Sequence, residues 1–200
     1  DLVEGKALAS GGHFEAAKSL LDSFLEKQPH LAAARVERGR VLMKLQKPAE
    51  AEKDFEAALQ LEKQAPVDWW LEAAQAGKAV EVLRRALNSI GNDPQLLSAS
   101  LEAELKEGNA TEAIQRVDAL QRIAPRCEPW MARREELLQA AGRHEEARNA
   151  WMALRSHLLS LPNLERGTPL LVGVLAQTEK ALGLAAPAPV VAPPALSPQS

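Results

Sequence analysis

The sequence is poor in the residue types that usually carry reactions or cross-links. It contains one cysteine, no tyrosine, three phenylalanines and four tryptophans among 200 residues. A single cysteine excludes an intrachain disulfide and a cysteine-rich metal site. Because no activating residues stand beside Cys127 in the sequence, we expect an inert structural residue or an exposed thiol, not a nucleophile.

Neither sign of charge dominates, and long apolar runs are missing. Lysine and arginine number 24 against 27 aspartates and glutamates, for a net charge of −3. A nucleic-acid-binding protein would normally show a basic stripe, so we expect no nucleic acid as partner. No run of 18 apolar residues occurs, which excludes a membrane-spanning helix and predicts no direct membrane insertion.

The first residue, Asp1, is neither a methionine nor part of a charged and apolar leader. We interpret the chain as processed or truncated, so that any targeting signal is out of view. The localisation is therefore unknown, and both the cytoplasm and a periplasmic or secreted compartment fit. The abundance of alanine, leucine and arginine suggests a bacterial origin.

What the chain does contain is an alanine that recurs at a fixed step. The five copies, separated by 34, 28, 34 and 34 residues, are Ala17, Ala51, Ala79, Ala113 and Ala147. A large apolar residue follows each copy four positions later, and these residues are Leu21, Phe55, Leu83, Val117 and Trp151. A period of about 34 residues is the signature of stacked helical hairpins.

Glycine and proline mark where the hairpins begin and end. We predict five of them, over about 1–29, 30–63, 64–91, 94–125 and 128–160. The third is six residues short, which predicts a shortened inner turn. A last helix over about 168–183 is predicted to cap the stack, so that the solenoid spans 1–183. Residues 184–200 are rich in proline and alanine and are predicted to be a disordered tail or linker.

The second hairpin resembles the tetratricopeptide repeat (TPR) family. Gly39 and Leu42 match the family's small and large residues in the first helix, and Ala51, Phe55 and Ala58 match its second helix. The resemblance implies an all-α, right-handed superhelical solenoid of about five helix-turn-helix repeats plus a C-terminal capping helix. Later copies depart from the pattern, since Leu101 and Glu135 stand where a small residue is expected.

No constellation of catalytic or metal-ligating residues is visible in the sequence. The four histidines are scattered, and the segment after His144 lacks the histidine spacing of zinc proteases. No glycine-rich phosphate loop or nucleophile triad is recognisable. We therefore predict that the chain is not an enzyme and that it has no catalytic residue, no metal site and no cofactor.

The resemblance implies that the first helices line a concave groove. The groove candidates are Lys6, Val36, Arg40, Met43, Lys44, Trp70, Glu102, Leu105 and Glu136. Three basic residues would make the N-terminal half basic and apolar, whereas Glu102 and Glu136 would make the other half acidic. A peptide with an acidic end and an apolar middle would fit such a groove. For Trp70 two interpretations stay open, an aromatic anchor for a ligand or packing against the shortened turn.

These features favour a non-catalytic protein–protein interaction module, a scaffold or adaptor that binds a protein or peptide partner in its groove. One alternative is an accessory domain of a larger secreted or periplasmic enzyme. Another is a structural unit that self-assembles as a homo-oligomer by stacking of the solenoid ends. The sequence identifies no particular partner.

Overall fold

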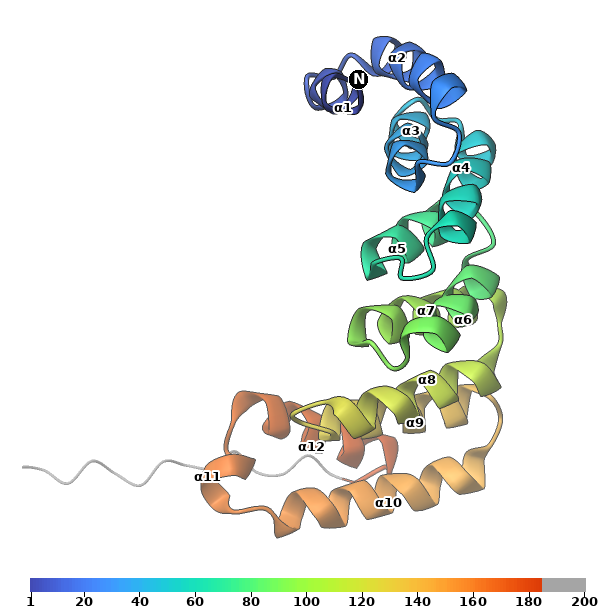
Figure 1. Ribbon diagram of the computed structural model, residues 1–200. Coiled ribbons are helices and arrows are strands. Elements are labelled where there is room, and N and C mark those ends of the chain that lie inside the picture. Colours follow the sequence, from blue (N-terminus) through green and yellow to red (C-terminus); the bar gives the residue numbers. More distant parts are fainter. Residues whose placement is uncertain (185–200) are drawn as a thin grey trace, which may run out of the picture. The chain divides into compact units, whose positions relative to one another are not determined.

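The computed structural model describes residues 1–184, which contain twelve α-helices and no strand (Figure 1). In chain order they are α1 (Leu2–Ser10), α2 (Phe14–Lys27), α3 (Ala32–Lys44), α4 (Pro48–Leu61), α5 (Val67–Ala76), α6 (Ala79–Ile90), α7 (Pro94–Glu107), α8 (Ala110–Ile123), α9 (Glu128–Ala140), α10 (His144–Ser160), α11 (Asn163–Arg166) and α12 (Pro169–Ala181). No helix in this part is both long enough and apolar enough to cross a membrane. The predicted tail lies, except for Leu184, outside the described residues.

The chain forms two compact units, and this differs from the single array that the sequence predicts. The first unit holds residues 1–123 with helices α1 to α8, and the second begins at Ala124 and holds α9 to α12. The boundary falls in the connection between α8 and α9, which contains Pro125. The helix bounds nevertheless follow the predicted hairpins, apart from the short helix α11, which the sequence analysis did not predict.

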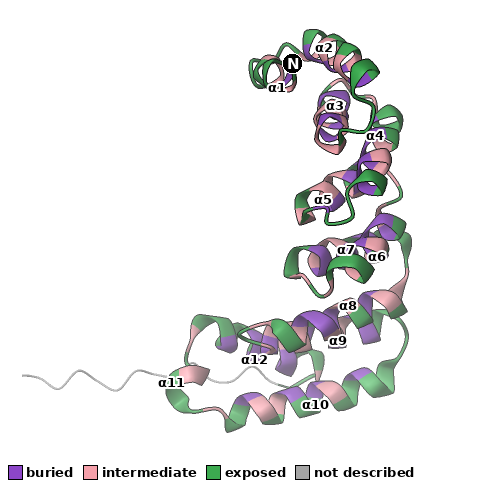
Figure 2. Cartoon of the chain, viewed as in Figure 1, coloured by how far each residue is buried: buried purple, intermediate pink, exposed green. Residues whose placement is uncertain are grey.

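In the first unit, successive helices form four hairpins whose first helices also contact one another. Contacts join α1 to α3, α3 to α5 and α5 to α7, so the first helices form one continuous layer. The second helix of each hairpin contacts the first helix of the next, which builds the stack. Figure 2 shows that buried residues occur along these helices and alternate with exposed ones.

The recurring alanine and the large residue after it form the core between helices. Ala17, Ala51 and Ala113 are each the fourth residue of their helix and are fully buried. Phe55 packs against Gly39, where a Cβ atom built on the glycine would come within 2.9 Å of the phenylalanine ring. The small residue therefore sets how closely α3 and α4 approach.

The third hairpin is shortened at its inner turn, as the sequence predicts. Helix α5 has 10 residues and α6 has 12, against 13 and 14 in the second hairpin. Only Gly77 and Lys78 connect α5 to α6, and Lys78 adopts a left-handed conformation with φ of 45°. Because α6 has lost its first turn, Ala79 is the first residue of the helix and is only half-buried.

In the second unit, α12 packs against both helices of the fifth hairpin. It contacts α9 and α10, and its buried residues are Leu171, Val174, Leu175, Thr178 and Glu179. Trp151, at the position of Phe55 in the repeat register, is buried as predicted. The capping helix thus covers the apolar face that α9 and α10 would otherwise expose.

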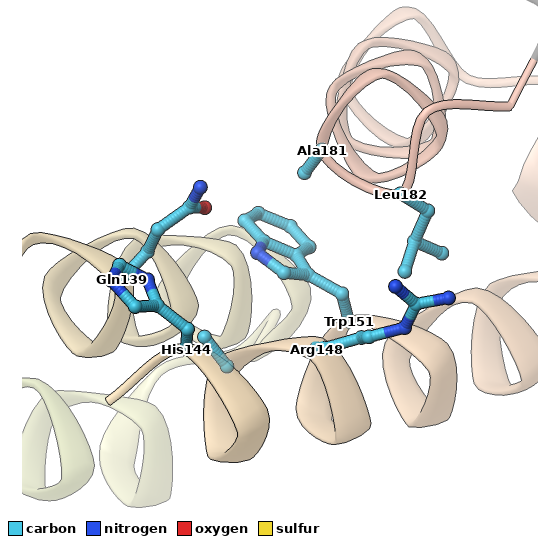
Figure 3. Close-up of a pocket in the computed structure, with 7 residues that line it drawn as sticks. Gln139, His144, Arg148, Trp151, Ala181 and Leu182 are labelled. Carbon is cyan, nitrogen blue, oxygen red and sulfur yellow. The ribbon is translucent and has the colours of Figure 1, made fainter. Parts of the chain in front are cut away.

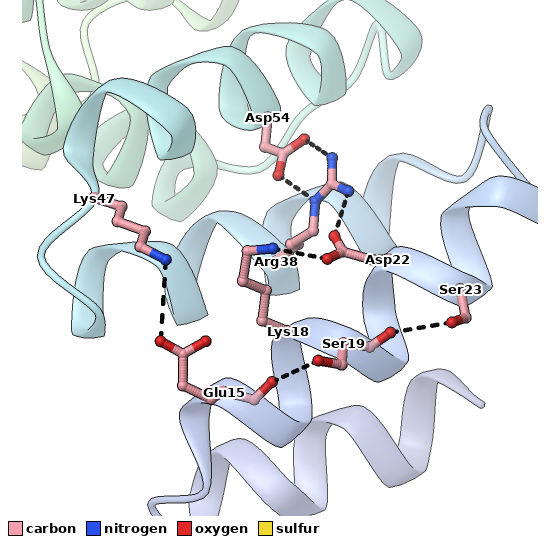
Figure 4. Close-up of polar contacts among 8 residues, drawn as sticks. All are labelled: Glu15, Lys18, Ser19, Asp22, Ser23, Arg38, Lys47 and Asp54. Atoms are coloured by element: carbon pink, nitrogen blue, oxygen red, sulfur yellow. Dashed lines mark hydrogen bonds and ion pairs between the residues drawn. The ribbon is translucent and has the colours of Figure 1, made fainter.

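A polar network joins the first hairpin to the second (Figure 4). Arg38 of α3 donates two hydrogen bonds to Asp54 of α4, at 2.6 and 2.7 Å, and a third to Asp22 of α2 at 2.8 Å. Lys18 donates to the other oxygen of Asp22 at 2.8 Å. Asp54 is only 3% exposed, so its charge depends on these partners.

Two carboxylates of the first unit stabilise the fold only while they are ionised. Burial raises the pKa of the Asp22 carboxyl, but hydrogen bonds from Lys18 and Arg38 outweigh burial and leave the pKa below 3.8. A hydrogen bond from Arg85 lowers the pKa of Glu56 below 4.5 against the effect of burial. Their contribution to stability is therefore present above these values and is lost as the pH falls through the lower folded-state values.

We expect Asp22→Asn to lower the free energy of unfolding by no more than about 1 kcal/mol near neutral pH, because the side chain is partly exposed. The difference from the unchanged protein should shrink as the pH falls below about 4. Urea unfolding at several pH values checks this, with the exposed Asp68→Asn as control. A difference that stays constant down to about pH 3 would contradict the assignment.

Candidate functional site

Two neighbouring hollows lie along the first helices of the first unit. One lies between α1, α2 and α3, has a volume of about 420 Å³, and is lined by Lys6, Ala9, Ser10, Phe14, Glu37, Arg40, Val41 and Lys44. The other reaches from α3 to α5, has a similar volume of about 420 Å³, and is lined by Arg40, Met43, Lys44, Gln46, Phe55, Glu72 and Gln75. Because both share Arg40 and Lys44, they form one groove across α1, α3 and α5.

Helix α3 supplies the side chains at the middle of this groove. Arg40, Met43 and Lys44 follow one another at helical spacing and lie on one face of α3. The structure thus brings together four of the predicted groove residues, these three and Lys6 of α1. Apolar surface comes from Phe14 and Met43, so the groove combines apolar walls with charged edges.

Arg40 is occupied by neighbours on both sides. It donates hydrogen bonds to the two carboxylate oxygens of Glu72 at 2.9 and 3.1 Å and to Glu37 at 2.5 Å. The hydrogen bond to Glu72 raises the pKa of Arg40 most, and it outweighs burial. Because Glu72 belongs to α5, this pair joins the second hairpin to the third.

The prediction of a basic N-terminal half needs correction. Lys6 lies 3.2 Å from Glu37, so Lys6 and Arg40 share this carboxylate, and Glu72 offsets Arg40 further. Three cations and two carboxylates leave a net charge of about +1 in the groove. Lys44 is exposed and forms no ion pair with any other residue in the part of the chain that is described. The attraction for an anion is therefore concentrated at Lys44.

Val36 and Trp70, which the sequence analysis placed in the groove, are buried in the core instead. Val36 is 1% exposed and Trp70 is 6% exposed, and both belong to the core of the second and third hairpins. The Arg85 guanidinium lies 5.7 Å from the centroid of the Trp70 ring and covers it. Trp69 packs against the same core while half-buried. Trp70 therefore packs in the core, as does Val36 at the equivalent position one repeat earlier.

The three remaining candidates do not line these hollows. On α7, Glu102 is exposed and Leu105 is half-buried, and neither lines either hollow. Glu136 belongs to the second unit, where it accepts hydrogen bonds from Gln177 at 2.6 Å and from Arg133 at 2.8 Å. The acidic half of the groove therefore stays a prediction.

Sequence reasoning missed the two carboxylates that shape the groove. Glu37 stands three residues before Arg40, a spacing that favours an ion pair within one helix and could have been recognised. Glu72 lies in the next hairpin, 32 positions after Arg40 and thus close to one repeat length away. A period of about 34 places such residues on equivalent helices that contact each other.

A smaller hollow lies in the second unit (Figure 3). Its volume is about 210 Å³, and it is lined by Gln139, His144, Ala147, Arg148, Trp151, Ala181 and Leu182. The indole N–H of Trp151 is buried and has no hydrogen-bond partner within the described residues. Figure 3 shows the Trp151 ring as the floor between α9 and the end of α12. Its polar rim can offer hydrogen bonds, but the hollow is half the volume of the ones in the first unit.

Comparisons with known proteins point to one family. Residues 2–68 and 36–96 match the family model described as tetratricopeptide repeat. No curated protein matches the sequence significantly. These findings confirm, for the N-terminal half, the resemblance that the second hairpin shows.

Solved structures of TPR proteins share the fold. YrrB, a TPR protein with an unusual peptide-binding site, has 20% sequence identity to this chain, and its structure matches with a TM-score of 0.56 over 76% of this chain and 81% of that chain. MamA is 15% identical with a TM-score of 0.59, over 81% of this chain and 93% of that chain. The C-terminal part of a TPR repeat-containing protein from Cytophaga hutchinsonii is 13% identical with a TM-score of 0.58, over 92% and 72%. The chain therefore has the fold of an all-α helical repeat solenoid.

Proposed function

Because residues 2–96 match the tetratricopeptide repeat family, we propose that the chain is a non-catalytic interaction module that binds an extended peptide segment of a protein partner. The segment lies in the groove across α1, α3 and α5. The observation that carries this proposal is the pair of hollows that share Arg40 and Lys44. The peptide-binding site named for YrrB supports it as a likeness of fold.

The walls of the groove indicate the chemistry of the peptide. Phe14 and Met43 offer apolar surface, which suits apolar side chains of a ligand. Lys44 stands between the two hollows with its charge unpaired within the described residues, which suits one carboxylate. We therefore expect a short peptide in which apolar residues flank an aspartate or glutamate.

Arg40 has a different role from Lys44 in this proposal. Its guanidinium is engaged with Glu37 and Glu72 and holds α3 to α5. Replacement of Arg40 would disturb the stacking of two hairpins and could not separate binding from folding. Lys44 is the residue whose replacement tests binding.

We expect Lys44→Glu to weaken the binding of acidic–apolar peptides by about tenfold or more, because it replaces attraction with repulsion. Peptides selected from a displayed random library provide the ligands, and fluorescence polarisation provides the dissociation constants. The matched control is Lys53→Glu, an exposed lysine of α4 that lines neither hollow, and it should leave binding unchanged. Failure to select any peptide, or equal weakening by both variants, would overturn the groove proposal.

Self-assembly is a second candidate, and exposed apolar side chains of the second unit favour it. Leu164 of α11 is 90% exposed, and Leu170 and Val172 at the start of α12 are about half exposed. Such residues can form the contact between copies of a chain. Light scattering separates the two candidates, since a concentration-independent monomer mass would exclude this one.

A further inference from the structure

Three side chains with metal-ligating atoms meet where α9 begins and α10 ends. Glu128 is the first residue of α9, Cys127 precedes it directly, and His157 lies in the last turn of α10. The ligating atoms of the three side chains all lie within 4.8 Å of one another. The Nε2 atom of His157 is 3.4 Å from the Oε1 atom of Glu128. The cluster lies wholly in the second unit and does not depend on the peptide groove.

Glu128 is the residue of this cluster whose carboxylate lacks, within the described residues, a hydrogen-bond partner at one oxygen. It is 4% exposed, and its Oε2 atom is buried without a hydrogen-bond partner in the described part of the chain. A buried carboxylate oxygen without a partner is costly. The nearest guanidinium, that of Arg126, lies 3.9 Å from Oε1 but is hydrogen-bonded to Glu165 at 3.0 Å. The charge of Arg126 is thus already shared, and the carboxylate of Glu128 is only partly compensated within the described residues.

We propose that Cys127, Glu128 and His157 bind one transition-metal ion of the zinc type. Thiolate, imidazole and carboxylate are the ligands that Zn²⁺ takes in proteins. In a tetrahedral zinc site, ligand atoms lie about 3.3–3.8 Å apart. The 3.4 Å between His157 and Glu128 already fits this range, and the Cys127 sulfur, within 4.8 Å of both, would have to approach by at most about 1 Å. Cys127 lies in the connection before α9 and His157 is partly exposed, so both can make this adjustment. Three protein ligands leave a fourth position for water.

Binding of the ion releases one proton and holds the start of α9 to the end of α10. The thiol of Cys127 loses its proton to solvent, and the sulfur, the imidazole nitrogen and a carboxylate oxygen each donate an electron pair to the ion. No oxidation or reduction takes place. The ion would hold the start of α9 to the end of α10, far from the turn that joins them, and so stabilise the folded hairpin.

Titration of the full chain with Zn²⁺ tests the site. The protein is used without a histidine tag and with a reductant that contains no thiol, and binding is followed by calorimetry. Absorption with Co²⁺ reports on the ligands through the bands of a tetrahedral ion and a thiolate-to-cobalt charge-transfer band. The variants are Cys127→Ser and His157→Ala, and the matched control is His144→Ala, an exposed histidine at the other end of the hairpin.

We expect one Zn²⁺ per chain, a raised melting temperature with Zn²⁺, and no response to Mg²⁺, which requires oxygen ligands. Cys127→Ser and His157→Ala should each weaken Zn²⁺ binding by about tenfold or more. The serine variant should also lose the charge-transfer band, and His144→Ala should retain both properties. Absence of binding, equal response to Mg²⁺, or unchanged affinity in Cys127→Ser would overturn the proposal and leave the cluster as packed polar residues.

Discussion

Replacement of Arg38 by methionine is expected to lower the free energy of unfolding of the first unit by about 2–4 kcal/mol. The change removes both hydrogen bonds that Asp54 accepts from Arg38, and within the described residues the other cation near Asp54 is Arg35 at 3.6 Å. A buried carboxylate would then lack adequate compensation. Asp22, which Arg38 also contacts, would keep Lys18 as its partner. The midpoint of urea unfolding, followed by circular dichroism, measures the effect.

Two further variants show whether charge burial is the cause. The control is Lys47→Met, which removes an ion pair of 4.0 Å between Lys47 and the exposed Glu15. This pair joins the same two hairpins, but because it is exposed, its loss should lower the free energy of unfolding by less than about 1 kcal/mol. The double variant Arg38→Met with Asp54→Leu removes both charges and should recover much of the loss. If the double variant is as unstable as the sum of its single changes, shape and not charge determines the effect.

Gly39→Ala is expected to destabilise the first unit by about 1–3 kcal/mol, although alanine is the better helix former. A Cβ atom at this position would meet three atoms of the Phe55 ring at 2.9, 3.0 and 3.1 Å. Phe55 is almost fully buried, so its ring cannot move away without disturbing the surrounding core. Overpacking would therefore outweigh the gain in helix propensity.

The control for this prediction is another glycine within a helix. Gly173 of α12 is exposed, and a Cβ atom built on it meets nothing within 4 Å. Gly173→Ala should therefore be neutral or stabilise the second unit by up to about 1 kcal/mol. Thermal unfolding of both variants gives the comparison. A stabilising Gly39→Ala would show that α3 and α4 can separate enough to accept a methyl group.

The helices could be predicted from the sequence because their signals are local. Pro48 and Pro94 stand in the first turn of α4 and α7, and the predicted hairpin boundaries fall between the observed helix pairs. The repeat register also identified the buried large residues, such as Phe55 and Trp151. Helical spacing and the repeat period depend on neighbouring residues of the chain, so they can be read without three-dimensional information.

The groove was predicted only in part, because it depends on contacts between hairpins. The repeat register named Lys6, Arg40, Met43 and Lys44, and these four residues line the two adjoining hollows. The charge of the groove was not predicted, since Glu37 and Glu72 offset the positive charge of Lys6 and Arg40. Long charged side chains choose partners according to the distance between helices, which the repeat period does not specify.

The sequence by itself determined that helices pair into hairpins and that the large apolar residue four positions after the recurring alanine is buried. The tertiary structure decided that Trp70 is buried, that the chain forms two compact units, and that Cys127, Glu128 and His157 meet. The physical reason is that hydrophobic periodicity constrains each helix separately. Burial of one particular side chain, and the meeting of residues that are about 30 positions apart in the sequence, are fixed only when the helices pack together.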